Sequence, residues 1–273
     1  MAGWSDDRAS SMGAAIAYYT LFSVAPLLLI IIAVAGMVFG EEAARGQIFS
    51  QIRGLVGEDG AAAMEGLVQS ARQPAQGTLA IIISVGAMLI GATAVFGELQ
   101  ASIDRIWRAP VQKRSGLVEL VRNRMLAFGM VLGIAFLMIV SLVASAAISA
   151  LGSFWRQAIG GWEPLLQLVN IAVSIVLFTV LFALIFRYLP RARVDWQDVW
   201  IGAAVTALLF TIGKFLIGLY IGKSSVASAF GAAGSLVTVL VWVYYSAQVF
   251  LLGAEFTWAY ANTYGSLSRK PGA

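Results

Sequence analysis

The polar residues whose types and spacing could do chemistry together lie in one strongly apolar stretch, residues 213–255. They are Lys214, Lys223, Ser224, Ser225, Tyr244, Gln248 and Glu255. Charged side chains are costly in apolar surroundings, and inside a membrane they mark substrate or ion pathways. A lysine beside a loop of Gly, Ser and Ala, whose backbone N–H groups are accessible, also suits the binding of an anion. The stretch is therefore the first candidate for a functional site.

Composition defines the class of protein that must position these residues. Hydrophobic residues make up 60% of the chain, charged residues only 12%, and the mean hydropathy is +0.85. These values indicate an integral membrane protein. The chain has no Cys and no His, which removes thiolate chemistry and the commonest general base and metal ligand. The net charge of +4 is typical of membrane orientation, so we expect no nucleic-acid partner.

Apolar runs of about 20 residues, the length that crosses a hydrocarbon core of roughly 30 Å, predict the spans. Six stretches qualify: residues 14–39, 78–97, 124–151, 165–189, 198–221 and 234–260. The expected fold is all-α, a polytopic bundle of six transmembrane helices forming one membrane domain over residues 1–273. Membrane lipids are its expected surroundings and partners.

The positions of Lys and Arg between the spans predict the orientation. Twelve of the 18 fall at the two termini, in residues 98–124 and in residues 187–197. Because basic residues accumulate on the cytoplasmic side, both termini are predicted to be cytoplasmic.

The connection at residues 41–76 is predicted to be a short external hairpin of two amphipathic helices. Apolar residues recur at helical spacing on either side of a turn at residues 57–60. They are Ile48, Ile52, Leu55 and Val56, then Met64, Leu67, Val68 and Ala71. The hairpin is either a cap on the bundle or a surface that binds a partner.

Two features of the spans bear on flexibility and packing. Pro26 lies inside the first span and is expected to kink or widen the helix, which makes it a candidate hinge. Three small-residue spacings predict close helix packing: Gly36 with Gly40, Gly129 with Gly133, and Gly218 with Gly222.

Helix lengths divide the candidate pathway into two sites. Lys214 is 16 residues beyond residue 198, roughly 24 Å along a helix, so it belongs to the external half with Lys223 and the small-residue loop. Glu255 belongs to the cytoplasmic half, where Glu98 and Arg187 are its expected neighbours. Tyr18, Tyr19, Tyr244 and Gln248 lie between the two sites.

A structural interpretation of the same residues stays open. The long side chain of Lys214 can reach outward to lipid headgroups. Glu255 and Arg187 can form a structural ion pair, and the tyrosines can belong to packing or to the interfacial aromatic belt.

Three stretches carry a resemblance to a known family. They are AAIAYYTLFSVAPLLL at residues 14–29, RYLPRARVDWQDVWIGA at residues 187–203, and the whole of residues 213–261. The chain resembles the YihY/virulence factor BrkB family of bacterial inner-membrane proteins. The resemblance implies a six-span fold in the bacterial inner membrane without an agreed biochemical activity, and an older ribonuclease BN label that is regarded as a misassignment.

The residues favour three possible functions to different degrees. A ribonuclease would need converging carboxylates or histidines around metals, and the 14 acidic residues show no such cluster, so no catalytic or metal site is expected and the chain is predicted not to be an enzyme. A transporter or exporter of an anionic or amphiphilic substrate, for example a lipid, accounts for the intramembrane charges. A non-transporting envelope scaffold is the alternative. No nucleotide-binding motif and no cofactor are expected.

Overall fold

The computed structural model describes residues 2–71, 78–110, 125–140, 143, 163–192, 194–223 and 234–268, and every regular element in these ranges is a helix. The helices are α1 (Ala2–Asp6), α2 (Ala9–Phe39), α3 (Glu41–Ala71), α4 (Thr78–Ile106), α6 (Glu163–Tyr188), α7 (Trp196–Lys223) and α9 (Gly234–Thr263). A further apolar helix covers Met125–Val140. The predicted all-α class is confirmed.

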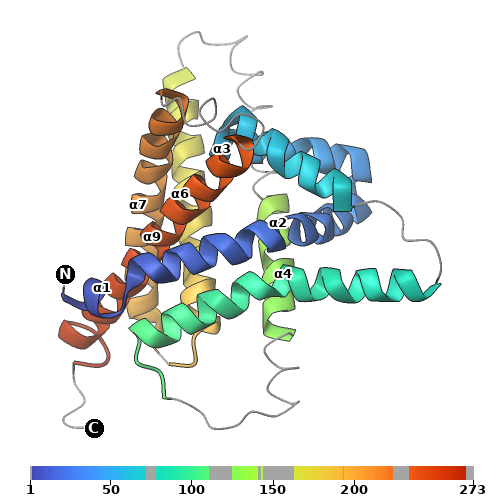
Figure 1. Cartoon of the computed structure of the whole chain (residues 1–273). Helices are drawn as coiled ribbons and strands as arrows, with labels where there is room; N and C mark the ends of the chain where they lie inside the picture. Colours follow the sequence, from blue (N-terminus) through green and yellow to red (C-terminus); the bar gives the residue numbers. More distant parts are fainter. Residues whose placement is uncertain are drawn as a thin grey trace.

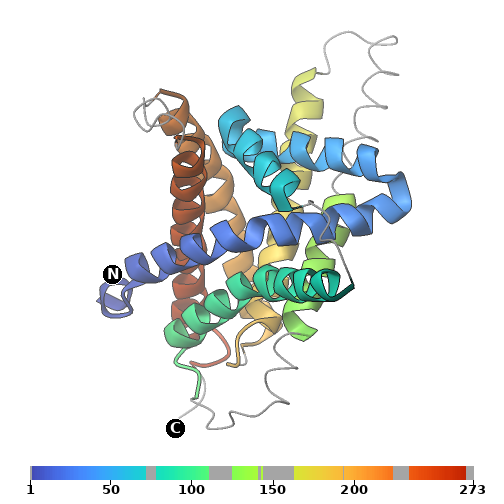
Figure 2. The same ribbon diagram turned by 45° about the vertical axis from the view of Figure 1, so that its right-hand side comes forward.

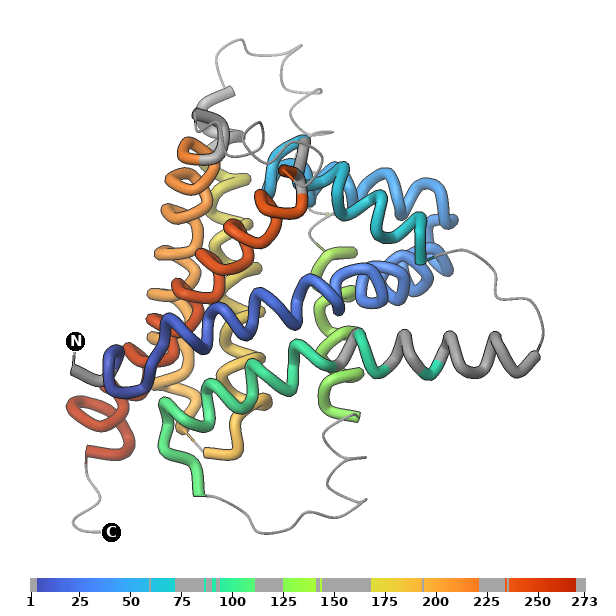
Figure 3. Tube along the Cα trace, in the orientation of Figure 1, coloured from blue at the N-terminus to red at the C-terminus, as the bar shows by residue number. Residues whose placement is uncertain are grey.

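The helices form two groups that cross (Figures 1 and 2). α6, α7 and α9 pack successively against one another, while α2 lies along α4 and crosses α9. The Cα trace shows α2 and α4 running side by side at a steep inclination to α6 and α7 (Figure 3). α9 is therefore the helix that joins the two groups.

Four helices within the described ranges are long and apolar enough to span a membrane: Ala9–Phe39, Leu168–Tyr188, Trp196–Tyr220 and Leu236–Thr263. They correspond to four of the six predicted spans. The predicted span at 78–97 lies inside α4, and that at 124–151 overlaps the helix Met125–Val140, most of the remainder lying outside the described residues. The total of six spans stays a prediction.

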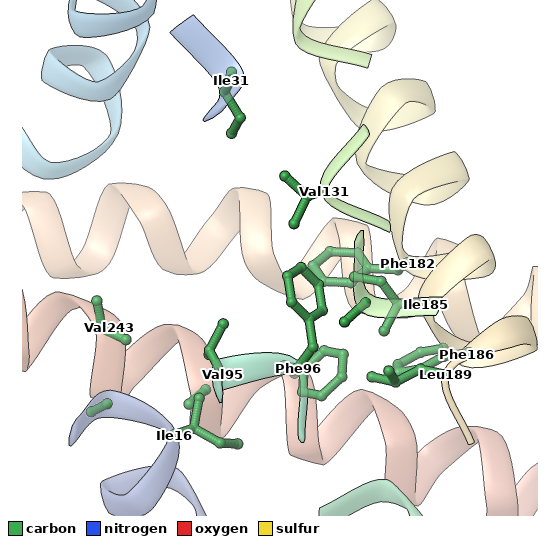
Figure 4. Close-up of a cluster of buried hydrophobic side chains, with 14 of the residues drawn as sticks. Ile16, Ile31, Val95, Phe96, Val131, Phe182, Ile185, Phe186, Leu189 and Val243 are labelled. Atoms are coloured by element: carbon green, nitrogen blue, oxygen red, sulfur yellow. The ribbon is translucent and has the colours of Figure 1, made fainter. Parts of the chain in front are cut away.

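The core between the two groups is aromatic. Phe182 and Phe186 of α6 stack at 6.3 Å between ring centroids, and both contact the ring of Phe250 from α9. Figure 4 shows Phe96 of α4 beside Phe182 and Ile185 of α6. The buried indole of Trp107 follows the end of α4 and closes this core at one end.

α3 is the predicted helical hairpin. The chain reverses at Gly57, whose φ of 82° and ψ of 178° break the helix in a conformation that glycine adopts without strain. An ion pair of 2.7 Å between Arg45 and Glu65 joins the two arms. The apolar face predicted from spacing is buried at Ile48, Ile52, Val56, Met64 and Val68. Leu55 and Leu67 are partly buried, but Ala71 is exposed, so the face ends earlier than predicted.

The hairpin packs on α2 and α9, as expected for a cap on the bundle. Gly60 lies next to Val239 near the start of α9. That it faces the outside of the cell stays a prediction.

α2 passes through Pro26 as one continuous helix. The proline ring packs on α4 where Gly91 leaves room, because a Cβ at Gly91 would lie 3.2 Å from Pro26 Cγ. The role of Pro26 as a hinge stays a prediction.

The close helix contacts differ from the three predicted glycine spacings. Among the described residues, a Cβ added at Gly40, Gly129, Gly133 or Gly218 would meet no other atom within 4 Å, so these glycines bring no two described helices together. The prediction was wrong there because the spacing shows that two small residues share a helix face without showing which helix, if any, that face meets.

Instead, α7 and α9 approach each other through a reciprocal glycine–threonine contact. Thr206 of α7 lies on Gly253 of α9, and Thr257 of α9 lies on Gly202 of α7. Each threonine hydroxyl donates to the carbonyl of the glycine four residues earlier on its own helix, at 2.7 Å. Both hydroxyls are thus satisfied while two Gly-xxx-Thr surfaces interlock.

Candidate functional site

A cavity of about 870 Å³ lies where α1 meets α7 and α9. It is lined by Trp4, Leu209, Ile212, Gly213, Leu216, Tyr245, Gln248, Val249, Leu252, Glu255, Phe256 and Ala259. Its walls are mainly apolar, and several lining side chains are open to the exterior, with 57% of Leu216 and 46% of Leu252 exposed. The cavity is therefore open to the surroundings of the bundle on one side.

One face of α9 supplies the polar edge of the cavity. Tyr245, Gln248 and Glu255 are three and seven residues apart, a spacing that places them along a single helix face. Gln248 fits only because Gly13 of α2 has no side chain, since a Cβ there would lie 2.1 Å from Gln248 Nε2. Gln248 Nε2 and Glu255 Oε1 are both buried without a hydrogen-bond partner. Buried polar atoms of this kind require an explanation, such as a ligand or water.

Glu255 faces the N-terminal segment and the end of α4. The charged groups that act on it are Asp7, between α1 and α2, which also hydrogen-bonds to it, the positive N-terminus, and Arg108, just after α4. Trp107 Nε1 donates to the carbonyl of Ala254 at 3.0 Å, which fixes the end of α4 beside this turn of α9. The carboxylate therefore sits where three parts of the chain meet.

Glu98 and Arg187, the predicted neighbours of Glu255, lie elsewhere. Arg187 donates to the carbonyl of Val194 and lies 5.4 Å from the ring centroid of Trp196. Glu98 is half-buried on α4 and makes none of the ion pairs found among the described residues. The expectation was wrong because similar depth in the membrane does not fix which way a side chain faces, and the turn before α7 already engages Arg187.

Lys214 does not line the cavity. It is half-buried on α7, with its Nζ 5.7 Å from the ring centroid of Phe215. The glycine–threonine contact places Glu255 level with about residue 204 of α7, so the two charges are roughly 15 Å apart along the helices. They form no ion pair.

The other members of the predicted external site cannot be placed beside Lys214. The side chain of Lys223, at the end of α7, and the residues Ser224 and Ser225 lie outside the described part of the chain. The anion site there stays a prediction.

The predicted tyrosines lie outside the cavity. Tyr18 and Tyr19 are 59% and 40% exposed on α2, and the ring of Tyr18 packs edge-on to Tyr19 and to Phe22. Tyr244 is partly exposed beside Gly13. Its neighbour Tyr245 lines the cavity instead, with its ring over Gly213 of α7.

The sequence did not indicate Trp4, which lines the cavity, or Asp7, which lies beside Glu255. Both lie in a polar N-terminal segment that carries no membrane-span signal. Tyr245 could have been predicted from the sequence, since its spacing from Gln248 and Glu255 places it on the same helix face.

Two further acidic residues have structural partners at the same end of the bundle. Asp198 at the start of α7 is buried and accepts hydrogen bonds from Ser266 N at 2.9 Å and Ser266 Oγ at 2.7 Å, which holds the turn after α9. Asp104 near the end of α4 accepts from the backbone N–H of Arg191 at 2.7 Å, with the guanidinium 3.8 Å away. Within the described ranges, no three acidic side chains converge as metal ligands.

Burial raises the pKa of Asp104 above its ordinary value of 3.8, and the Arg191 backbone N–H and guanidinium offset this only in part. Since the folded-state pKa is raised, the charged form opposes folding at neutral pH, and this cost is lost as the pH falls through that pKa. We therefore expect that, as the pH is lowered from 7 to 4 in detergent, the melting temperature of the wild type increases relative to that of Asp104→Asn. The asparagine keeps an acceptor for Arg191 but does not titrate. A difference that falls with decreasing pH would contradict this assignment.

Comparison with protein families agrees with the helical membrane architecture. The family model described as virulence factor BrkB matches residues 1–273. The chain belongs to the virulence factor BrkB family. This BrkB-family chain is 27% identical over 263 residues to a UPF0761 membrane protein of Psychrobacter sp. (strain PRwf-1), covering 92% of the chain and 46% of that relative.

Two other relatives carry the same description. A UPF0761 membrane protein of Stenotrophomonas maltophilia (strain K279a) is 28% identical over 256 residues, covering 92% of the BrkB-family chain and 57% of the relative. A UPF0761 membrane protein of Pseudoalteromonas translucida (strain TAC 125) is 29% identical over 256 residues, covering 92% of the BrkB-family chain and 81% of the relative. The chain thus spans about half the length of the first two relatives. No solved structure matches it.

Proposed function

We propose that this BrkB-family protein is a transporter or permease-like protein that moves an amphiphilic molecule through the cavity between α1, α7 and α9. The observation that carries the proposal is the pairing of wide apolar walls with a polar edge on α9. Ligand sites commonly combine a largely apolar concavity with a few polar groups that orient the ligand. A transporter also requires a cavity that reaches intramembrane polar residues, and this one reaches Gln248 and Glu255.

The exposure of the walls favours an amphiphile over a water-soluble substrate. Ile212, Leu216 and Leu252 line the cavity and are each about half exposed, so an apolar chain can occupy it directly from the lipid. The polar head would then meet the α9 face. Among the described lining residues, Glu255 is the one side chain of a type that is charged at neutral pH, so the chemistry of this cavity supports the amphiphilic part of the expected substrate class rather than the anionic part.

We further propose the bacterial inner membrane as the location, with both termini in the cytoplasm. Arg108 and Arg191 lie at the end of the bundle that holds Glu255 and the turn after α9. Basic residues gathered at one end support a cytoplasmic assignment for that end, and the relatives are bacterial.

Flux measurements in reconstituted vesicles test the transport proposal. Purified protein in liposomes with fluorescently labelled lipids and single-chain amphiphiles is expected to move at least one probe faster than protein-free vesicles. Removing the Glu255 charge with Glu255→Gln is expected to lower that flux about tenfold, because a hydrogen bond to a charged group contributes roughly 1.5–3 kcal/mol.

Glu98→Gln is the matched control, since Glu98 is also a half-buried acid of a long helix but does not line the cavity. Its flux should equal that of the wild type. Background flux for the wild type with every probe would reject the transporter and favour the scaffold alternative.

A further inference from the structure

The end of the cavity at Glu255 combines a carboxylate with two aromatic rings. Trp4 from α1 and Phe256 from α9 line the cavity with Glu255. We infer that the cavity selects amphiphiles with a cationic head, a primary amine or a quaternary ammonium group, bound between Glu255, Trp4 and Phe256. This inference deepens the proposed function and rests on it for the route by which the amphiphile arrives.

Charge is the first argument. No Lys or Arg is among the described residues that line the cavity, and Glu255 keeps one buried oxygen, Oε1, without a hydrogen-bond partner in that part of the chain. Asp7 is a second acidic side chain beside Glu255 and hydrogen-bonds to it, while the positive N-terminus and Arg108 act on the pair without lining the cavity. Among the described lining residues an anionic head would meet the Glu255 carboxylate and no cationic side chain.

The aromatic rings are the second argument. A cation over the face of Trp, Tyr or Phe is attracted by the ring quadrupole, and cages of such rings recognise quaternary ammonium groups. Trp4 is partly buried, and Phe256 keeps 37% of its surface exposed although it stacks on Tyr260 at 6.2 Å. Both rings therefore retain surface for a ligand.

The length of the cavity orients the ligand. Tyr245 lines the cavity ten residues before Glu255 on α9, roughly 15 Å away along the helix. Between these ends the walls are made by Ile212, Leu216 and Leu252 among others. A single apolar chain can lie along this wall with its head at Glu255, at the end of the bundle predicted to be cytoplasmic.

Binding of a matched probe series separates head recognition from transport. The protein is placed in nanodiscs of zwitterionic lipid with dibrominated amphiphiles that share one C18 chain and carry a trimethylammonium, a hydroxyl or a phosphate head. Bromine quenches nearby tryptophan fluorescence, and subtracting the signal of Trp4→Phe isolates the response of Trp4. The trimethylammonium probe should reach half-maximal quenching at about tenfold lower mole fraction than the phosphate probe, the order expected for a partly desolvated cation–π contact with a carboxylate.

Two variants make the test decisive. Glu255→Gln should bring the three probes to within about twofold of one another while the hydroxyl probe still binds. Glu98→Gln should keep the wild-type preference. Equal binding of all heads by the wild type, or a preference for phosphate, would overturn the inference even if flux is observed. Selective binding without flux would leave the inference standing and reject the transporter.

Discussion

The Gly253→Leu variant is expected to be markedly less stable than the wild type. A Cβ at this position alone would lie 2.0 Å from Thr206 Oγ1 and within 2.8 Å of two further Thr206 atoms. Thr206 is fully buried and its hydroxyl is bonded to Gly202 O, so it cannot rotate away without losing that bond. Overpacking costs ~1–3 kcal/mol and more where relief is blocked. Because α9 joins both helix groups, we expect this energy to lower the melting temperature by about 2–12 °C.

Gly218→Leu on α7 is the matched control. It introduces the same side chain into a helix at a glycine with no neighbouring atom within 4 Å. Helix propensity alone then predicts a gain of about 0.5–1 kcal/mol. Melting followed by size-exclusion chromatography in detergent compares the two variants. Equal stability of both would show that the glycine–threonine contact does not hold α7 to α9.

The Leu216→Trp variant is expected to lower flux of the amphiphile about tenfold or more without destabilising the protein. Leu216 lines the cavity and is 57% exposed, so the indole extends into the cavity instead of the core. An occluding ring competes directly with the chain of the ligand, and a loss of roughly 1.4 kcal/mol of binding corresponds to tenfold. Initial rates in proteoliposomes, normalised to reconstituted protein, measure the effect.

Leu219→Trp supplies the control for that variant. Leu219 lies three residues further along α7 with the same 57% exposure, but it does not line the cavity. Its rate should match the wild type. If both tryptophans reduced the rate equally, the effect would come from the lipid-facing surface of α7 and the cavity would not be the pathway.

Periodicity and composition were sufficient to predict the main features of the fold. The hydropathy of the chain indicated a helical membrane bundle, and the spacing of Ile48, Ile52 and Val56 placed the buried face of the hairpin correctly. The reversal at Gly57 follows from glycine chemistry that a sequence shows directly. These features are local, so neighbouring residues suffice to predict them.

The candidate site depended on relations between helices that local patterns do not contain. Tyr244 and Tyr245 are adjacent in sequence and about 100° apart around a helix, and only the packing of α9 on α7 decides that Tyr245 faces the cavity. In the same way, Glu255 and Arg187 have similar depth, but the turn before α7 captures Arg187 while Glu255 meets the N-terminal segment. The depth of a residue in the membrane can be predicted by counting residues along its helix. The direction in which its side chain faces depends on which helix packs against it.

The glycine–threonine contact has a consequence for biosynthesis. α7 leaves the ribosome about 40 residues before the end of α9, a delay of roughly 2–8 s at 5–20 residues per second. During that time the small-residue surface at Gly202 and Thr206 has no partner from its own chain. Slow synthesis or overproduction would prolong this interval and increase the chance that α7 pairs with a small-residue surface of another nascent chain. Expression yield should therefore respond to translation rate over residues 224–263 more than over earlier connections.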